Sequence, residues 1–159
     1  RDLVRSRGLG DVYKRQMDTY SFGYSSSGFT DMPMNHKVFL AQFDAIKKLA
    51  SEGPCVMVGR CADYALSEYK DCFSVFVHAD TDWRINRLSQ KHNKTAKEAK
   101  DMINKTDKSR SSYYNYYTNK KWGAASSYNL CVDSSKLGID GAAKAIIQAI
   151  EIFDSIKNK

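Results

Sequence analysis

The chain has 159 residues, which is enough for one domain with a substantial core. Its hydrophobic content of 42% and its charged content of 27% are ordinary for a globular protein, and neither a run of about 18 apolar residues nor a secretory signal is visible. The net charge is +7 for the whole chain and +4 without residues 1–16, a modest positive balance that suits an anionic small-molecule substrate as well as nucleic acid.

Residues 1–16 differ from the rest of the chain. They show no helix or strand period, and they closely resemble the translation of a sequencing-adapter read-through. We therefore expect them to be a non-native segment and leave them out of the fold reasoning. They hold five cations and two acids, so the rest of the chain carries +4. Residues 17–34 are rich in serine and glycine and are expected to form a loop.

The cysteines and histidines do not form a metal-binding pattern. Cys55, Cys61, Cys72 and Cys131 show no C-x-x-C spacing, and the three histidines are scattered. We expect no metal site from these residues. We expect four buried, reduced thiols in a cytoplasmic protein.

The first half of the chain predicts a helix, a strand, a helical piece and a second strand. Asn35 is a candidate cap for a helix with apolar residues at helical spacing, and Gly53 ends that helix. Residues 55–58 (Cys-Val-Met-Val) follow a Gly-Pro break and predict a buried strand. Residues 61–69 predict a polar helical piece. The nearly continuous apolar run at 72–78 is typical of a parallel strand covered on both faces.

The second half predicts three helices and one strand. A helix begins at 80–81, and the capping box Thr95-Ala-Lys-Glu98 begins another, which runs into the cationic stretch 105–122. Residues 128–133 predict a third short strand. Residues 143–153 have the clearest amphipathic period in the chain and predict the last helix.

Strands that alternate with helices in this order predict an α/β fold with a parallel sheet. Three strands are few for such a sheet, so we expect strands to be missing, most simply from the N-terminus. Ligands of such sheets bind beyond the carboxyl ends of the strands. This rule selects residues 59–63, 78–80 and 133–135.

The stretch 105–122 holds five cations, one carboxylate and four tyrosines. Cations near Asp107 and Arg110 would suit a group that carries phosphate. The alternative is a solvated helix face with aromatic residues packed beneath it. Tyrosines in this pattern could also stack on a base, but packing is the commoner role of an aromatic cluster. Arg84 and Arg87 share a helix face and could likewise be a solvated surface.

Three motifs, which stand in the right order along residues 17–155, resemble the cytidylate kinase-like branch of the nucleoside monophosphate kinases. They are Val-Gly-Arg60-Cys-Ala-Asp63-Tyr, Thr106-Asp-Lys-x-Arg110-x-x-Tyr-Tyr-x-x-Tyr-Thr-x-x-Lys-Trp and Cys131-Val-Asp-Ser-Ser-x-x-Gly-Ile. The resemblance implies a P-loop kinase fold, a three-layer parallel sheet with helices on both faces. It also implies one kinase-like domain over 17–159, with a mobile lid at about 95–122. The implied reaction moves the γ-phosphoryl group of ATP, with Mg²⁺, to a nucleoside monophosphate such as CMP or dCMP.

The resemblance implies that three residues bind the acceptor nucleotide. Arg60 would pair with its phosphate, since a guanidinium fork matches phosphate oxygens. Asp63 would orient Arg60 or meet a ribose or base group. Asp107 would contact the acceptor nucleotide from the lid.

The resemblance implies that cationic side chains contact and neutralise the phosphoryl group that is transferred. Arg110 would contact it directly, Arg84 and Arg87 would support it from the preceding helix, and Lys105 and Lys108 would add positive field. Phosphoryl transfer depends on alignment and on charge neutralisation, so no histidine base or serine nucleophile is required.

The donor site is the point of departure from the family. Ser134 and Ser135 resemble the turn beside the adenine of ATP, but no G-x-x-x-x-G-K-[ST] phosphate loop occurs in the chain. We expect the seat of ATP and Mg²⁺ to lie in a missing N-terminal part, and this chain to have little or no kinase activity. Two alternatives stay open. One is a non-catalytic nucleotide- or RNA-binding module, and the other is a P-loop kinase with a different small acceptor.

Overall fold

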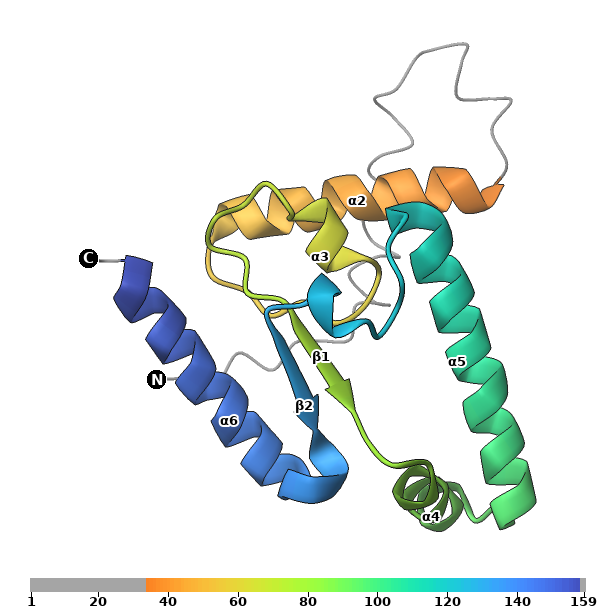
Figure 1. The fold of residues 1–159 in the computed structure, drawn as a ribbon. Coiled ribbons are helices and arrows are strands. Elements are labelled where there is room, and N and C mark those ends of the chain that lie inside the picture. The colour runs from red at the N-terminus through yellow and green to blue at the C-terminus, as the bar shows by residue number, and fades with distance from the viewer. Residues whose placement is uncertain (1–33, 158–159) are drawn as a thin grey trace. The chain divides into compact units, whose positions relative to one another are not determined.

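The computed structural model describes residues 34–157. The chain divides into two compact units, Arg1–Ala41 and Gln42–Lys159. Six helices, one of them a 3₁₀ turn, and two strands follow one another in the described residues. Figure 1 shows their arrangement. Their bounds are α2 Met34–Glu52, α3 Ala62–Ala65, β1 Val75–His78, α4 Thr81–His92, α5 Ala96–Thr118, η1 Ala125–Ser127, β2 Leu130–Asp133 and α6 Ser134–Lys157.

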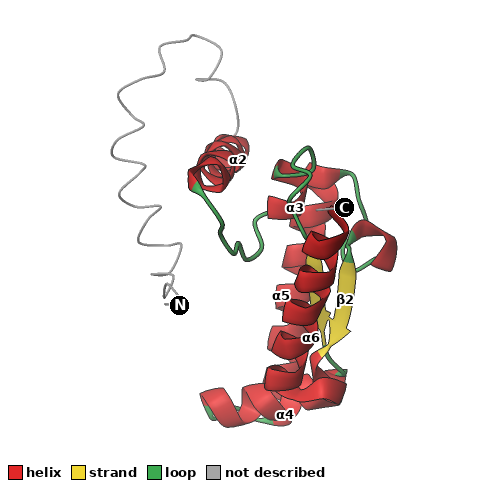
Figure 2. Ribbon diagram, turned by 90° about the vertical axis from the view of Figure 1, so that its left-hand side faces the viewer, coloured by secondary structure: helices red, strands yellow, loops and turns green. Residues whose placement is uncertain are grey.

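β1 and β2 pair in parallel, with Val75 opposite Leu130 and His78 opposite Asp133. Both strands lie within the predicted strands 72–78 and 128–133. β1 is rich in β-branched and aromatic residues, whereas β2 holds one β-branched residue, Val132, beside Leu130 and Cys131. α6 follows β2 directly and packs on both strands (Figure 1). The result is a mixed α/β structure, mostly helical, with a small parallel sheet (Figure 2). The three-layer arrangement stays a prediction.

The predicted strand at 55–58 is wrong. Val56 is 89% exposed and Val58 is 78% exposed, and the segment takes part in no backbone hydrogen bond within the described residues. An apolar run forms a strand only when a neighbour satisfies its N–H and C=O groups, and no described strand lies beside this one. Cys55 is consequently exposed, and Cys72 and Cys131 are only partly buried, so the prediction of four buried thiols is correct for Cys61 alone.

The second half of α2 packs on α3. Ile46, Ala65 and Leu66 form a buried cluster, against which Phe43 and Ala50 are partly buried. The helical spacing of the apolar residues in α2 therefore predicted the buried face. α2 begins one residue before Asn35, which consequently lies in its first turn rather than at its cap. The predicted helical piece 61–69 shortens to the single turn of α3.

α4 and α5 form the pair of helices that carries most of the predicted site. α5 begins at the predicted capping box, in which Thr95 Oγ1 accepts from the Glu98 N–H and the Glu98 carboxylate accepts from the Thr95 N–H. Ala99 and Ile103 are buried on its inner face. α5 runs unbroken from the capping box through most of the cationic stretch. Between residues 34 and 157, no helix combines the length and hydropathy that a membrane span requires.

The last helix begins earlier than predicted. α6 starts at Ser134, and Gly138 interrupts it with φ +70° and ψ 173°, a conformation outside the helical region. Gly138 therefore makes a kink between a short first segment and the amphipathic helix. Phe153 of this helix packs on Phe73, just before β1, with ring centroids 5.1 Å apart.

Candidate functional site

Asp107 of α5 binds two of the predicted arginines at once. Arg84 of α4 donates from Nη1 to Oδ2 at 2.7 Å and from Nη2 to Oδ1 at 2.9 Å. Arg110, one turn along α5, donates from Nη2 to the same Oδ1. The Arg84 contact is a bidentate fork, the strongest geometry that this pair of groups can adopt. The packing of α4 on α5 thus brings together three residues that lie up to 26 positions apart in the sequence.

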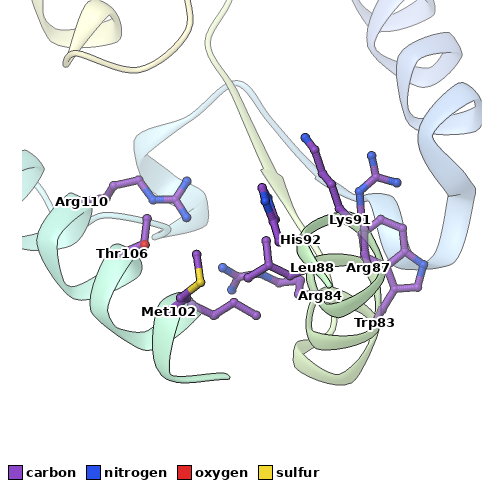
Figure 3. Close-up of a pocket in the computed structure, with 10 residues that line it drawn as sticks. Trp83, Arg84, Arg87, Leu88, Lys91, His92, Met102, Thr106 and Arg110 are labelled. Carbon is purple, nitrogen blue, oxygen red and sulfur yellow. The ribbon is translucent and has the colours of Figure 1, made fainter. Parts of the chain in front are cut away.

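A cleft of about 280 Å³ lies between α4 and α5 beside this ion pair. Figure 3 shows Arg84 and Arg110 extending toward each other across it from the two helices. Its lining, in the part of the chain that the structure describes, includes four cations and a histidine but no carboxylate. Apolar side chains and Thr106 complete the wall. The lining residues are Trp83, Arg84, Arg87, Leu88, Lys91, His92, Met102, Ile103, Thr106 and Arg110.

The cleft includes two polar residues that the sequence reasoning missed. Lys91 and His92 follow Arg87 and Leu88 by one helical turn, so they continue the same face of α4. That spacing was the available signal. Arg87 lines the cleft, and its guanidinium carbon lies 5.4 Å from the centroid of the Trp83 ring.

Lys105 and Lys108, predicted to support the same group, are exposed on α5 and do not line the cleft. Lys108 offers its backbone carbonyl to the hydroxyl of Ser111. The two ammonium groups therefore contribute to the site only through their long-range field, which salt screens.

Arg60 sits on a strained turn. Gly59, Arg60 and Cys61 have φ values of +72°, +59° and +55°, so three consecutive residues occupy the left-handed region, two of them with side chains. Hydrogen bonds from the Ala62 N–H to the Gly59 carbonyl and from the Tyr64 N–H to the Cys61 carbonyl hold the turn. Arg60 is exposed and forms no ion pair with any described residue. Strain that presents a free arginine supports a ligand-binding role.

Asp63 is held by α5. The hydroxyl of Tyr114 donates to Asp63 Oδ2 at 2.6 Å, and Tyr114 is only 6% exposed. Burial, and then this hydrogen bond to a carboxylate, raises the pKa of Tyr114 far above its usual value. The Tyr128 ring stacks on Tyr114 with centroids 6.2 Å apart. Asp63 thus joins α3 to α5.

Ser134 and Ser135 connect the carboxyl ends of the two strands. The Ser134 hydroxyl donates to the carbonyl of His78 at 3.0 Å, and the Ser135 hydroxyl accepts from the Asp80 N–H at 3.1 Å. Ser135 also donates to Asp133. The structure therefore brings together 78–80 and 133–135, two of the three segments that the sequence selected, whereas 59–63 follows no described strand. Neither serine lines the α4–α5 cleft. Their contact with adenine stays a prediction.

The comparisons with known proteins agree with the motifs. A family model described as the cytidylate kinase-like family matches residues 4–136. The chain belongs to this family. The resemblance found in the sequence is thereby confirmed, and membership of this kinase-like family suggests a nucleotide kinase.

The matched range contains every candidate residue from Arg60 to Ser135 and most of the segment 1–16, whose non-native origin stays a prediction. A solved relative is the crystal structure of an uncharacterized protein from Eubacterium ventriosum ATCC 27560. The two chains are 32% identical, the match covers 78% of this chain and 70% of the other, and the TM-score is 0.71. The search of the curated proteins finds no match.

The reaction expected from the sequence resemblance includes Mg²⁺, an ion that proteins bind through one or two carboxylates together with substrate phosphates. Within residues 34–157, no three histidine, cysteine or carboxylate side chains lie close enough together to hold a metal. Asp107, the one carboxylate at the arginine cluster, is already bound by Arg84 and Arg110. We assign no residue of this part of the chain to Mg²⁺.

The acid side of the stability profile is expected to depend on Asp107. Burial favours a higher pKa for this carboxyl, but hydrogen bonds from Arg84 and Arg110 outweigh it and hold the pKa below its ordinary value. An unfolded aspartate titrates near pH 3.9, about the ordinary value. Asp107 therefore stabilises the fold fully above that pH, and the contribution disappears as the pH falls through the folded pKa.

Urea unfolding from about pH 6 to about pH 3 measures this contribution. The stability gap between the wild type and Asp107→Asn should be largest near pH 6 and should narrow below about pH 4. Asp101→Asn removes an exposed carboxylate from the same helix and is the matched control. A gap that stays constant down to pH 3 would contradict the assignment.

The four cysteines are expected to differ in reactivity. Burial, and then the charge of Asp63, raises the pKa of the Cys61 thiol to about 11, and Cys61 is 4% exposed. Cys55 is exposed. Because the thiolate is the nucleophile, iodoacetamide at about pH 8 should label Cys55 first and Cys61 last, as measured by peptide mass spectrometry. Equal labelling rates at the two positions would refute the described environment of Cys61.

Proposed function

We propose that the α4–α5 cleft binds the phosphate of a nucleoside monophosphate, CMP or dCMP. In a longer protein that also carries a site for ATP, the same cleft would neutralise the phosphoryl group passed from ATP. The observation that carries this proposal is the convergence of Arg84, Arg87 and Arg110 on one cleft without a carboxylate in its lining. Family membership supports the reaction class.

The size and charge of the cleft fit a phosphate better than a whole nucleotide. Its volume of about 280 Å³ is at the lower limit of small-molecule sites, and its cations come from two helices. Guanidinium forks match phosphate oxygens, and the transition state of phosphoryl transfer needs its equatorial charge neutralised rather than a covalent partner. The nucleoside would then extend out of the cleft.

The Arg84–Asp107–Arg110 cluster arranges the arginines before a ligand arrives. A single carboxylate leaves the two guanidinium groups with a net positive charge and with donors to spare. A phosphate can therefore add to the cluster without any large movement of the helices. Arg60, on its strained turn, would supply a further cation to the acceptor phosphate.

Calorimetric titration of the 159-residue chain tests the proposal. CMP and dCMP should bind more tightly than AMP, UMP or GMP, and inorganic phosphate should compete with them. An RNA-binding module would instead lose affinity steeply with salt and show no preference among mononucleotides. Binding of single-stranded RNA with that salt dependence, without binding of any monophosphate, would overturn the proposal.

Turnover by this chain is a separate expectation. Without a G-x-x-x-x-G-K-[ST] motif in its 159 residues, it should form no detectable CDP from ATP and CMP. A coupled assay for ADP measures this. Turnover near the 1–100 s⁻¹ that is roughly typical of kinases would show that another segment holds the donor phosphates.

A further inference from the structure

The two tryptophans of the chain each lie beneath an arginine of the cleft. Trp83 lines the cleft itself and lies under Arg87. Trp122 lies outside the cleft lining, in the loop after α5, yet its ring centroid is 5.3 Å from the guanidinium carbon of Arg110. The contact that joins Trp122 to the cleft lining therefore runs through Arg110.

The position of Trp122 is fixed from two sides. Its backbone N–H donates to Asn115 Oδ1 at 2.7 Å, which folds the loop back on α5. Its ring meets Phe76 of β1 edge to face, with centroids 5.3 Å apart and an interplanar angle of 88°. Gly123 has φ +76°, and a Cβ at this position would lie 3.2 Å from the Phe76 ring. The loop is therefore packed closely against the sheet.

Arg110 needs such a support because its side chain is 54% exposed. Its ion pair with Asp107, three residues earlier on the same helix, fixes one guanidinium nitrogen. The face of the Trp122 ring lies against the guanidinium as a second contact, and a cation near an aromatic face is attracted to it. Two contacts from different elements restrict a long side chain before a ligand binds, which reduces the entropy lost on binding.

We infer that Trp122 is a positioning residue that connects Arg110 to strand β1 and holds its guanidinium at the cleft. This role deepens the proposed phosphate-binding function and rests on it, but the arrangement itself can be tested without any ligand. The chain of contacts runs from Phe76 through Trp122 and Arg110 to Asp107, and Arg84 binds Asp107 from α4.

The ligand-free test follows the carboxyl of Asp107, which faces Arg84 from α4 and Arg110 from its own helix. Its pKa is measured by carbon NMR in the wild type, Trp122→Leu, Trp122→Phe and Tyr116→Leu. Trp122→Leu should raise the pKa of Asp107 because Arg110 spends less time beside it, and Trp122→Phe should raise it less because a ring face remains. Tyr116 is a ring of α5 that is 77% exposed, so Tyr116→Leu should leave the titration unchanged.

The binding test uses CMP and inorganic phosphate as probes. Loss of a cation–π contact of about 1 kcal/mol corresponds to roughly fivefold weaker binding in Trp122→Leu. In the Arg110→Ala background, the same change should have no further effect, since its influence passes through Arg110. A merely structural role would instead weaken binding equally in both backgrounds.

The outcomes separate this inference from the function on which it rests. An unchanged Asp107 pKa in both a folded Trp122→Leu and a folded Trp122→Phe would overturn the positioning role, whatever the chain binds. A raised pKa in a chain that binds no monophosphate would support the positioning role and overturn the proposed function. Thermal unfolding of each variant shows that the comparison is made between folded proteins, and Trp122→Phe serves alone if the leucine variant does not fold.

Discussion

Replacing Arg84 with alanine is expected to weaken the binding of CMP by roughly tenfold to a hundredfold. Both terminal nitrogens of Arg84 are engaged with Asp107, and the side chain is only 29% exposed. Hydrogen bonds to charged groups contribute about 1.5–3 kcal/mol, which corresponds to this range of affinity. In the alanine variant, only Arg110 would still bind Asp107. The cleft would therefore lose the cation of Arg84 and the ion pair that holds α4 to α5.

Two further variants distinguish geometry from charge. Arg84→Lys keeps the positive charge but cannot form a bidentate fork, so it should show most of the loss. Lys100→Ala removes one charge from an exposed position on α5 that does not line the cleft, and it should have little effect. Calorimetric titration with CMP at one fixed salt concentration measures all three. If Lys100→Ala weakened binding as much as Arg84→Ala, net charge rather than the cleft would determine affinity.

The strands show what the sequence could and could not predict. The runs 72–78 and 128–133 have strand-like composition and do pair with each other. The run 55–58 has the same character, yet it pairs with no strand that the structure describes, and its valines are exposed. Composition indicates that a segment suits a strand, but pairing depends on which neighbour lies beside it, and that information is not local to the segment.

The site shows the same limit in another form. The resemblance to a family selected Arg84, Asp107 and Arg110 as site residues. It did not predict that the Asp107 carboxylate would bind both arginines. That contact depends on how α4 packs on α5, because Arg84 and Asp107 lie 23 residues apart. Trp122 was part of a recognised motif without an assigned role. Its place under Arg110 follows from the path of the loop after α5.

The tyrosines of α5 had two alternative roles in the sequence, packing and stacking on a base. Tyr114 is 6% exposed and bound to Asp63, so packing is correct for this residue. Tyr116 is 77% exposed. Helical spacing places these two rings 200° apart around the helix, since each residue turns it by about 100°. The run Tyr-Tyr-x-Tyr-Tyr therefore could not be buried as a whole, and only the packing of α5 decides which ring is inside.

Tyr114→Phe is expected to lower the free energy of unfolding by about 1.5–3 kcal/mol, the usual contribution of a hydrogen bond to a charged group. The ring would keep its packing, including its contact with Tyr128. The half-buried carboxylate of Asp63 would lose the donor that lies 2.6 Å away and would be left with a desolvation cost that no described side chain offsets.

Urea unfolding of the wild type, Tyr114→Phe and Tyr116→Phe measures this effect. Tyr116→Phe removes the same hydroxyl from an exposed ring of the same helix, so its change should stay within about 0.5 kcal/mol. In the double variant Tyr114→Phe with Asp63→Asn, the second change should cost less than it does alone, since the two groups share one interaction. Additive losses would show that the hydroxyl and the carboxylate act independently and that α3 is not held to α5 through this bond.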